Sequence, residues 1–181
     1  NSDVDLTWEY TVTDSNMSIQ IYPQNVSFNG SSIPIGSLLG VFFTNDSGEL
    51  TCAGYEEWTG GQISVAAFAT ESGLDNGFAS GEEITWGLRI GDQSFLADTT
   101  SMNNQGIFSP TFSPNGFGQL LHASFSGDLD EIQGCTDENA CNYDQFATTD
   151  DGSCTNPQTF YQDSDNDGLG NPSVSLTSCN E

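Results

Sequence analysis

Acidic side chains at alternate positions near the C-terminal end form the pattern with the clearest chemistry in this sequence. Three aspartates, at 163, 165 and 167, are each separated by one residue, and Gly168 follows the third. Oxygen atoms at this spacing along a loop can turn toward one hard cation, and glycine allows the tight turn that brings a later backbone carbonyl to the same ion. Calcium accepts many oxygen ligands in flexible geometry, so Ca²⁺ is the expected cofactor. The expected ligands are Asp163, Asp165, Asp167, Leu169 and Asn171.

Nothing nearby in the sequence neutralises these acids, because no lysine or arginine occurs from Glu131 to Glu181. Carboxylates held this close repel one another unless a cation joins them. The stretch follows the start of the EF-hand loop pattern, but Val174 stands where that pattern has a bidentate glutamate, and no helical periodicity flanks it. It instead resembles the aspartate-rich calcium loops of thrombospondin type 3 repeats, which are non-helical and share ligands between neighbouring turns. The alternative interpretation is a solvated acidic linker.

A second group of oxygen-bearing side chains lies upstream of this loop and is a candidate for another calcium ion. In the alternative interpretation, Asp137 and Asp150 cap turns through their own backbone. The members of the group are Asp137, Asn139, Asn142, Asp144, Asp150 and Asp151.

The charge of the whole chain indicates what it can associate with. Twenty-six acids face a single cation, Arg89, which gives a formal net charge of −25. Nucleic acids and anionic membrane surfaces are therefore excluded as electrostatic partners, and no apolar run is long enough to insert across a bilayer. The balance favours divalent cations and an extracellular or saline setting. Five cysteines, four of them in the last 47 residues, indicate an oxidising compartment.

Short segments typical of β-strands fill the first two thirds of the chain. Residues 6–12 and 17–21 alternate apolar with polar side chains, and residues 38–43 form a nearly continuous apolar run, as in a strand covered on both faces. The pattern predicts an all-β fold, an antiparallel β-sandwich of immunoglobulin-like or jelly-roll-like type. The further expected strands are 49–55, 63–69, 83–90, 94–97, 107–112 and 120–125.

Turn-forming pairs separate these expected strands and supply the positive φ that tight turns need. The pairs are Asn29-Gly30, Ser47-Gly48, Gly60-Gly61, Asn76-Gly77 and Gly91-Asp92. An acidic, turn-rich stretch at 127–134 then marks the expected domain boundary. We expect a β-sandwich domain at 1–130 and a Cys/Asp-rich irregular module at 131–181 that disulfides and calcium stabilise.

The first 90 residues contain a series of motifs rich in aromatic residues and glycine. They are Trp8, Gly40-Val41-Phe42-Phe43, Cys52-Ala53-Gly54-Tyr55, Trp58-Thr59-Gly60, and Gly77-Phe78 with Glu82 and Trp86. Together they resemble a β-sandwich domain of secreted Bacteroidota surface proteins. It implies export and display at the cell surface without a defined chemistry.

A second resemblance covers the segment that begins Gly134-Cys135-Thr136-Asp137, continues through Ala140-Cys141-Asn142-Tyr143 and ends at Asp150-Asp151-Gly152-Ser153-Cys154. It closely resembles a short repeat of the same secreted proteins, which usually precedes a type IX sorting signal. No such signal follows here, so we expect the chain to be a fragment or a processed product.

The repeat resemblance also implies a disulfide pairing. In the repeat the first and last cysteines recur most regularly, so Cys135 with Cys154 is the preferred pair. Cys141 is then left for Cys179, although related sequences often supply a partner further downstream. Connectivity does not follow from spacing alone. The fifth cysteine, Cys52, is expected to be a buried and inert thiol.

We find no sequence pattern for catalysis, and we expect the chain not to be an enzyme. The one histidine, His122, lies inside an expected strand as a structural edge residue, and no nucleophile elbow, zinc helix or phosphate-binding glycine loop occurs. Asp98-Thr99-Thr100 resembles a short bacterial O-glycosylation motif, which makes Thr99 a candidate glycosylation site.

The sequence leaves two hypotheses for function. The first is a structural or adhesive module of an extracellular surface protein or filament, with further copies of itself or surface glycans as partners. The alternative is a carbohydrate-binding module of a secreted multidomain protein, in which aromatic rings stack on sugars. The candidate aromatics are Tyr55, Trp58 and Trp86.

Overall fold

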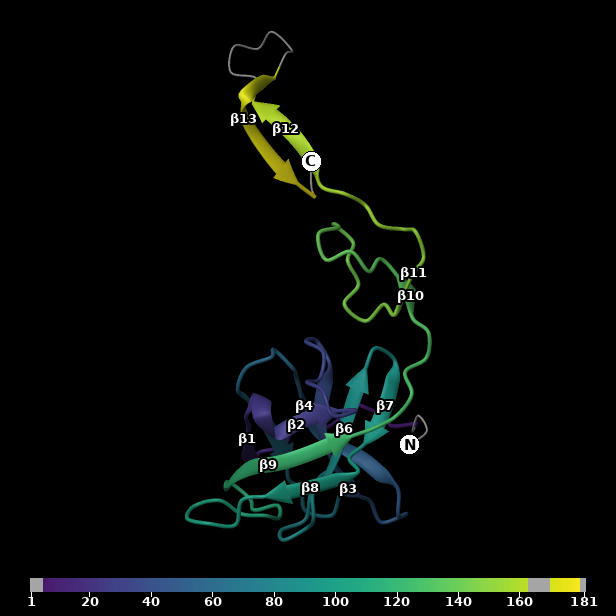
Figure 1. The fold of residues 1–181 in the computed structure, drawn as a ribbon. Helices are drawn as coiled ribbons and strands as arrows, with labels where there is room; N and C mark the ends of the chain where they lie inside the picture. Colours follow the sequence, from purple (N-terminus) through teal and green to yellow (C-terminus); the bar gives the residue numbers. More distant parts are fainter. Residues whose placement is uncertain (1–4, 163–169, 180–181) are drawn as a thin grey trace. The chain divides into compact units, whose positions relative to one another are not determined.

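The computed structural model describes residues 5–162 and 170–179, and it is built almost entirely from β-strands (Figure 1). The chain forms two compact units, Asn1–Asp130 and Glu131–Glu181, here called the first and the second unit. The aspartates at 163, 165 and 167 and Leu169 lie outside the described residues. The first unit is a β-sandwich, as the sequence pattern predicts.

One sheet of the first unit is organised around its longest strand, β9 (Phe117–Phe125). Its early residues pair in parallel with β1 (Asn16–Ile21), and its late residues pair in parallel with β2 (Val26–Phe28). On its other edge β9 pairs antiparallel with β8 (Thr99–Met102), and β1 pairs antiparallel with β5 (Ile63–Phe68). This sheet is therefore mixed, whereas the sequence pattern predicts only antiparallel strands.

A short 3₁₀ helix, η1 (Pro23–Asn25), separates β1 from β2 along the same edge of β9. Proline suits the first position of such a helix because its missing N–H would have no partner there. The side-chain amide of Asn25 donates to the carbonyl oxygen of Leu120 at 2.6 Å. The amide thus joins η1 to β9 between the two stretches of parallel pairing.

The second sheet has the order β4-β3-β6-β7 and is antiparallel throughout. Its strands are β4 (Leu50–Glu57), β3 (Leu38–Thr44), β6 (Thr85–Ile90) and β7 (Gln93–Leu96). Alternate residues of each strand point to opposite faces. Phe95 of β7 meets Phe28 of β2 with ring centroids 4.9 Å apart, so this face of the second sheet packs against the first sheet. The buried core includes Met17, Ile19, Ile21, Leu39, Val41, Phe43, Val65, Trp86, Leu88, Phe95, Leu120 and Phe125.

The outer face of the second sheet is covered by residues 5–12, which we call the N-terminal strap. The sequence prediction of a strand over 6–12 is wrong, because the strap forms no β-ladder. Its alternating side chains dock onto the sheet instead: the Trp8 ring meets Phe42 edge-on at 5.1 Å, and Tyr10 meets Tyr55 edge-on at 5.3 Å. The strap explains why β3 is buried on both faces, as its apolar run predicts.

Glycine creates the space that the strap needs. Gly40 of β3 stands directly opposite Gly87 of β6, so the middle of the outer face has no side chains of its own. A Cβ on Gly40 would lie 2.6 Å from Cζ3 of Trp8, and a Cβ on Gly87 would lie 2.5 Å from Cε2 of Phe42. The two aromatic rings therefore occupy the hollow that the paired glycines leave.

The expected strand at 107–112 is also absent. Ile107 is 72 % exposed, and Phe108 makes only an isolated bridge to Phe117. Phe112 is buried and stacks on Phe78 with ring centroids 5.1 Å apart. The apolar residues here anchor a loop by single side chains and do not build a ladder. The strands β2 and β8 are not among the expected ones.

The turn prediction is confirmed at Asn29-Gly30, where both residues have positive φ, 49° and 76°. This is the backbone of a type I′ hairpin turn, and Phe28 and Ser31 on either side exchange both backbone hydrogen bonds. Gly77 differs, because it is needed for close packing: a Cβ there would lie 2.5 Å from the backbone carbonyl of Ala69.

The described residues of the second unit form two small sheets. The strands β10 (Gln133–Gly134) and β11 (Thr149–Asp150) pair in parallel, and β12 (Gln158–Gln162) pairs antiparallel with β13 (Asn171–Ser178). Disulfides join Cys135 to Cys154 and Cys141 to Cys179, the pairs that the repeat resemblance implies. Among its described residues the only buried apolar side chain is Cys135. The unit is therefore held by covalent links more than by burial.

Reduction should unfold the second unit and leave the first intact. The chain-entropy model assigns about 3 kcal/mol to a link spanning 19 residues and about 4 kcal/mol to one spanning 38. We expect dithiothreitol to collapse the amide dispersion of residues 131–179 in an NMR spectrum. The near-ultraviolet circular dichroism should persist, because Trp8, Trp58 and Trp86 all lie in the first unit. Loss of both signals together would contradict this prediction.

Candidate functional site: a polar pocket beside the N-terminal strap

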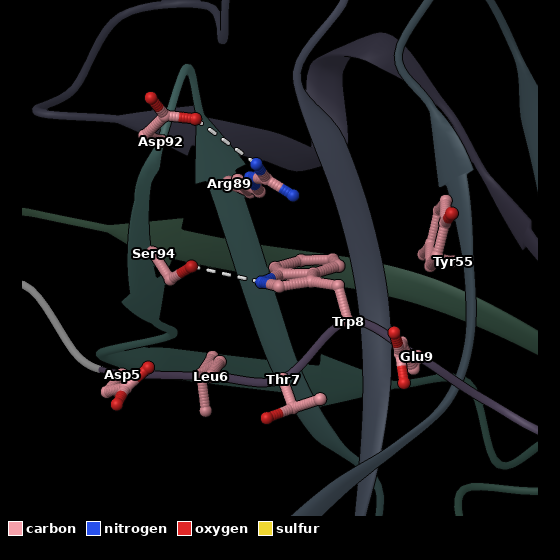
Figure 2. A pocket seen from close by; sticks show the side chains of 9 residues that line it. All are labelled: Asp5, Leu6, Thr7, Trp8, Glu9, Tyr55, Arg89, Asp92 and Ser94. Atoms are coloured by element: carbon pink, nitrogen blue, oxygen red, sulfur yellow. Dashed lines mark hydrogen bonds and ion pairs between the residues drawn. The ribbon is translucent and has the colours of Figure 1, made fainter.

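A cavity of about 650 Å³ opens where the N-terminal strap runs over the second sheet (Figure 2). The strap provides one wall, and the strands β4, β6 and β7 and the turn after β6 provide the rest. The lining residues are Asp5, Leu6, Thr7, Trp8, Glu9, Tyr55, Arg89, Asp92 and Ser94. Most of these side chains carry a hydrogen-bonding group, so the cavity is a polar one.

The strap is fixed at the edge of this cavity by a buried hydrogen bond. The indole Nε1 of Trp8 donates to Oγ of Ser94 at 3.0 Å, joining residues 86 positions apart in the sequence. Trp8 is 9 % exposed and Ser94 5 %. The buried indole N–H and the buried hydroxyl thus each have a hydrogen-bond partner. The bond holds the strap in a defined position on the sheet.

The only basic side chain of the protein, Arg89, projects into the cavity from β6. Its Nε donates to the carbonyl oxygen of Gly91 at 3.0 Å, and its Nη2 pairs with Oδ1 of Asp92 at 3.3 Å. Both side chains of the pair are accessible, at 35 % and 102 % relative exposure. The pair presents a planar donor group and an acceptor side by side to solvent.

The charge of the lining is negative. Three carboxylates, those of Asp5, Glu9 and Asp92, face the one guanidinium, which leaves a formal charge of −2. An anionic ligand would meet net repulsion here. The lining contains no histidine or cysteine, and its hydroxyls, carboxylates and guanidinium can all take part in hydrogen bonds.

Two of the three aromatics expected to contact sugars are not available at the surface. Trp58 is 2 % exposed and Trp86 is 1 % exposed, because both rings belong to the sandwich core. Strand tryptophans are large apolar groups whose burial stabilises the fold, and alternation along a strand does not reveal which face is the inner one. Tyr55 is the exception, since its side chain borders the cavity.

The expected calcium loop is described only at its ends. Asn171 pairs with Gln162 across the β12–β13 ladder, which brings the two ends of the aspartate segment together. Oδ1 of Asn171 accepts a hydrogen bond from the backbone N–H of Ser173 at 2.9 Å. The four other expected ligands, at 163, 165, 167 and 169, lie outside the described residues.

The upstream oxygen-bearing group is engaged in local turns. Four of its carboxylates each accept a hydrogen bond from the backbone N–H two residues later, the arrangement of Asx turns; these are Asp137, Asp144, Asp150 and Asp151. Among the described residues no group of three or more histidine, cysteine, aspartate or glutamate side chains is placed to hold a metal ion. These hydrogen bonds favour the alternative interpretation, in which Asp137 and Asp150 cap turns.

The two asparagines of this group also support the turns. The amide of Asn142 donates to the carbonyl of Ser153 at 2.8 Å and accepts from the backbone N–H of Thr155 at 2.7 Å. The side chain and backbone N–H of Asn139 both donate to Asp137. These donors lower the pKa of the Asp137 carboxyl, the backbone N–H having the larger effect. Ser153 lowers the pKa of the Asp151 carboxyl, and there its side chain has a larger effect than its backbone N–H.

Thr99, the candidate glycosylation site, lies exposed at the start of the edge strand β8. Its hydroxyl is within hydrogen-bonding distance of Nε2 of His122, at 3.0 Å, and of Oγ of Ser124, at 2.8 Å. His122 is an exposed residue of β9, opposite Ser101 of β8. The position is accessible, and whether it is modified stays a prediction that mass spectrometry of the native protein can test.

Cys52 lies beneath the strap, in a buried cluster with Trp8 and Phe42. It is 1 % exposed and is the one unpaired cysteine. Burial raises the pKa of its thiol to about 11, outweighing a smaller lowering by the backbone of Gly54. The thiol is therefore almost wholly protonated near neutral pH, which is the state of an inert cysteine.

Comparison of the chain with protein-family models, with curated proteins and with solved structures finds no match. In the described part of the chain, none of the helical structure has the length and apolar character needed to cross a membrane. Two disulfides fit an oxidising compartment. Fold and site thus define a class, a β-sandwich with a polar surface pocket followed by a disulfide-linked module.

The reactivity of Cys52 should report whether the strap is docked. In the native protein we expect no reaction with a thiol reagent at pH 8, because a pKa of about 11 leaves about one thiolate in a thousand. Trp8→Ala removes the ring that covers the cluster and should cost about 3 kcal/mol. It should also make Cys52 react many times faster with the thiol reagent, measured in the absence of denaturant.

The control for this experiment is Trp58→Phe, which changes a core tryptophan outside the Cys52 cluster. It should lower stability without a comparable gain in thiol reactivity. Equal reactivity gains in both variants would mean that Cys52 responds to global opening and not to the strap.

The titration of Asp137 should show how the Asx turns depend on pH. Because its pKa is lowered in the folded protein, the turn contributes stability above the ordinary carboxyl pKa of about 3.9 and loses it as the pH falls through the folded pKa. Asn139→Ala should move the pKa of Asp137 part of the way back, since the backbone donor remains. Carboxyl ¹³C titration measures this, with Asp151 as the internal reference that should not move.

Proposed function

We propose that this chain is a non-catalytic, extracellular module of a bacterial surface protein or filament, which holds or joins other molecules and is stiffened by disulfides and calcium. The observation that carries the proposal is the construction of the second unit. Its described residues have almost no buried apolar side chains, yet two crosslinks tie them together. Small units built this way are typical of secreted proteins.

The placement of the crosslinks supports a stiffening role. Cys135–Cys154 closes the repeat segment on itself, and Cys141–Cys179 ties that segment to the end of β13. Each bridge has an ordinary Cα–Cα separation, 4.8 Å and 5.2 Å. A force applied along the chain would therefore meet covalent links within this unit, which suits a spacer.

The absence of an evident reaction centre in the described part of the chain supports a non-catalytic role. The pocket of the first unit has carboxylates, hydroxyls and one guanidinium, but no histidine or cysteine. His122 is an exposed residue of β9, and its Nε2 lies within hydrogen-bonding distance of the Thr99 hydroxyl. Cys52 is buried with a raised pKa. We infer a module that binds and does not transform its partner.

Calcium is proposed for the segment between β12 and β13. The donor set is made only of oxygen atoms, from Asp163, Asp165, Asp167, Leu169 and Asn171, which suits a hard cation. The pairing of Gln162 with Asn171 brings the ends of the segment together, and no lysine or arginine lies nearby in the sequence to compete. Bound calcium would neutralise the repulsion among these carboxylates.

Calcium binding should stabilise the second unit specifically. An ion that binds only the folded state adds about 2.7 kcal/mol at a hundred times its dissociation constant. We expect millimolar calcium to slow hydrogen exchange in residues 158–162 and 171–178, and chelator to reverse the effect. The triple change Asp163→Asn, Asp165→Asn and Asp167→Asn should abolish it.

The matched control removes three exposed acids elsewhere, through Glu49→Gln, Glu57→Gln and Glu138→Gln, and so alters the net charge by the same amount. It should keep the calcium effect. Equal loss in both triple variants would show that calcium acts as a diffuse counterion, and no protection in either the native chain or the variants would reject the proposed site.

A further inference from the structure

We propose that the pocket beside the N-terminal strap binds a neutral, hydroxyl-rich ligand of the saccharide class, with Arg89, Asp92 and Tyr55 as contacting side chains. This deepens the proposed function by naming what the first unit holds, and it rests on that function only in assuming that the module binds a partner. The argument uses residues of the first unit alone.

The size of the pocket suits a small organic ligand. Its volume of about 650 Å³ falls within the range of about 300–1,000 Å³ found for ligand pockets. The walls come from strands and from a strap anchored by the buried Trp8–Ser94 hydrogen bond. A site of this kind is largely formed before the ligand arrives, so little ordering cost is added on binding.

The charge of the pocket selects against acidic ligands. The lining carries three carboxylates and one guanidinium, on a protein with a formal charge of −25. A phosphate, sulfate or uronic acid would approach against this field. A divalent cation is not favoured either, because the described residues bring no three acidic, histidine or cysteine side chains together for one. The field of the lining therefore favours an uncharged ligand over an acidic one.

The hydrogen-bonding groups identify the neutral ligand as a polyol. Arg89 offers only donors, the carboxylates of Asp92, Asp5 and Glu9 only acceptors, and the phenol of Tyr55 both. A sugar hydroxyl both donates and accepts, so adjacent hydroxyls can bridge the Arg89 guanidinium and the Asp92 carboxylate at once. The 3.3 Å separation of that pair and its exposure keep both partners open to such bonds.

The Arg89–Asp92 pair is not needed to hold the fold. Exposed ion pairs contribute little to stability, and both side chains of this pair are accessible to solvent. The single arginine of the protein thus lines this cavity and forms an ion pair with one carboxylate. Substitution of either residue should leave a folded protein in which binding can be measured.

The indole N–H signals provide the measurement. The protein has three tryptophans, of which Trp8 lines the pocket while Trp58 and Trp86 are buried in the core. We would titrate the ¹⁵N-labelled full chain with neutral oligosaccharides of glucose, xylose, mannose and galactose, and with oligogalacturonate as the acidic counterpart. A saturable shift of the Trp8 signal with at least one neutral oligosaccharide, and no shift of the other two tryptophans, is the expected result.

Variants test which groups make the contact. Arg89→Gln and Asp92→Asn should each weaken binding about tenfold or more, since each removes a charged hydrogen-bonding group. Tyr55→Phe should weaken it by a smaller factor. The matched controls are Asp46→Asn, an exposed aspartate away from the pocket, and Tyr22→Phe, a tyrosine between β1 and η1, and both should leave the affinity unchanged.

Three results would overturn the inference. The first is no response to any neutral oligosaccharide at about 10 mM, which corresponds to a binding free energy weaker than about 3 kcal/mol. The others are preferential binding of oligogalacturonate, and binding of a neutral oligosaccharide that survives both Arg89→Gln and Asp92→Asn. None of these bears on calcium in the second unit, whose hydrogen-exchange test is read from other residues. The two proposals therefore fail separately.

Discussion

The seating of Trp8 on the outer face of the second sheet is the contact on which the first unit depends. Gly40 and Gly87, opposite each other on neighbouring strands, leave a hollow in that face. Trp8 enters it from a segment that forms no ladder, and its Nε1 finds Ser94. Without the ring, Phe42 and Cys52 would face water. The pocket follows from the same contact, because the strap that covers the sheet also builds one of its walls.

The second unit is stabilised by a different interaction from the first. A unit of about 50 residues buries too little apolar surface to offset its conformational entropy. Here the described residues keep large apolar groups such as Leu176 and Tyr161 exposed, and two disulfides reduce the entropy of the unfolded chain instead. Asx turns satisfy the backbone between the crosslinks. The two units therefore use different interactions within one chain.

Sequence patterns predicted the elements whose signal is local. The alternation in β1 and the apolar run of β3 reflect burial, and both strands form as expected. The alternation at 6–12 is equally clear, but it cannot distinguish pairing of the backbone from docking of side chains onto a sheet. The polar edge strand β8 carries no apolar signal, and the parallel direction of β9 leaves no trace in its composition. The docking of 6–12, the strand β8 and the direction of β9 all depend on contacts between residues far apart in the sequence.

Most of the candidate pocket could not be predicted from the sequence, because it too depends on contacts between residues far apart in the chain. Only Tyr55 among the expected sugar-binding aromatics lines it, because Trp86 of β6 and Trp58, which follows the end of β4, are both buried in the core. Arg89 stands out in the sequence as the single arginine. Ser94 lies opposite it through the β6–β7 ladder, whereas Trp8 reaches the same pocket only because the strap docks onto the sheet. A signal did exist: Gly40 and Gly87 within apolar strands indicate close approach by another group.

The charge of the protein connects these observations. With one arginine and no lysine, the chain has almost no capacity for ion pairs, and Arg89–Asp92 is the one salt bridge of the described residues. The stability of the fold comes from burial, hydrogen bonds and disulfides, which salt does not screen. The repulsion comes from carboxylates, and salt largely screens it at separations beyond about 8 Å at physiological ionic strength. Added salt therefore removes an unfavourable contribution and leaves the favourable ones in place. The free-energy cost of the acidic surface is thus smallest where the ionic strength is high.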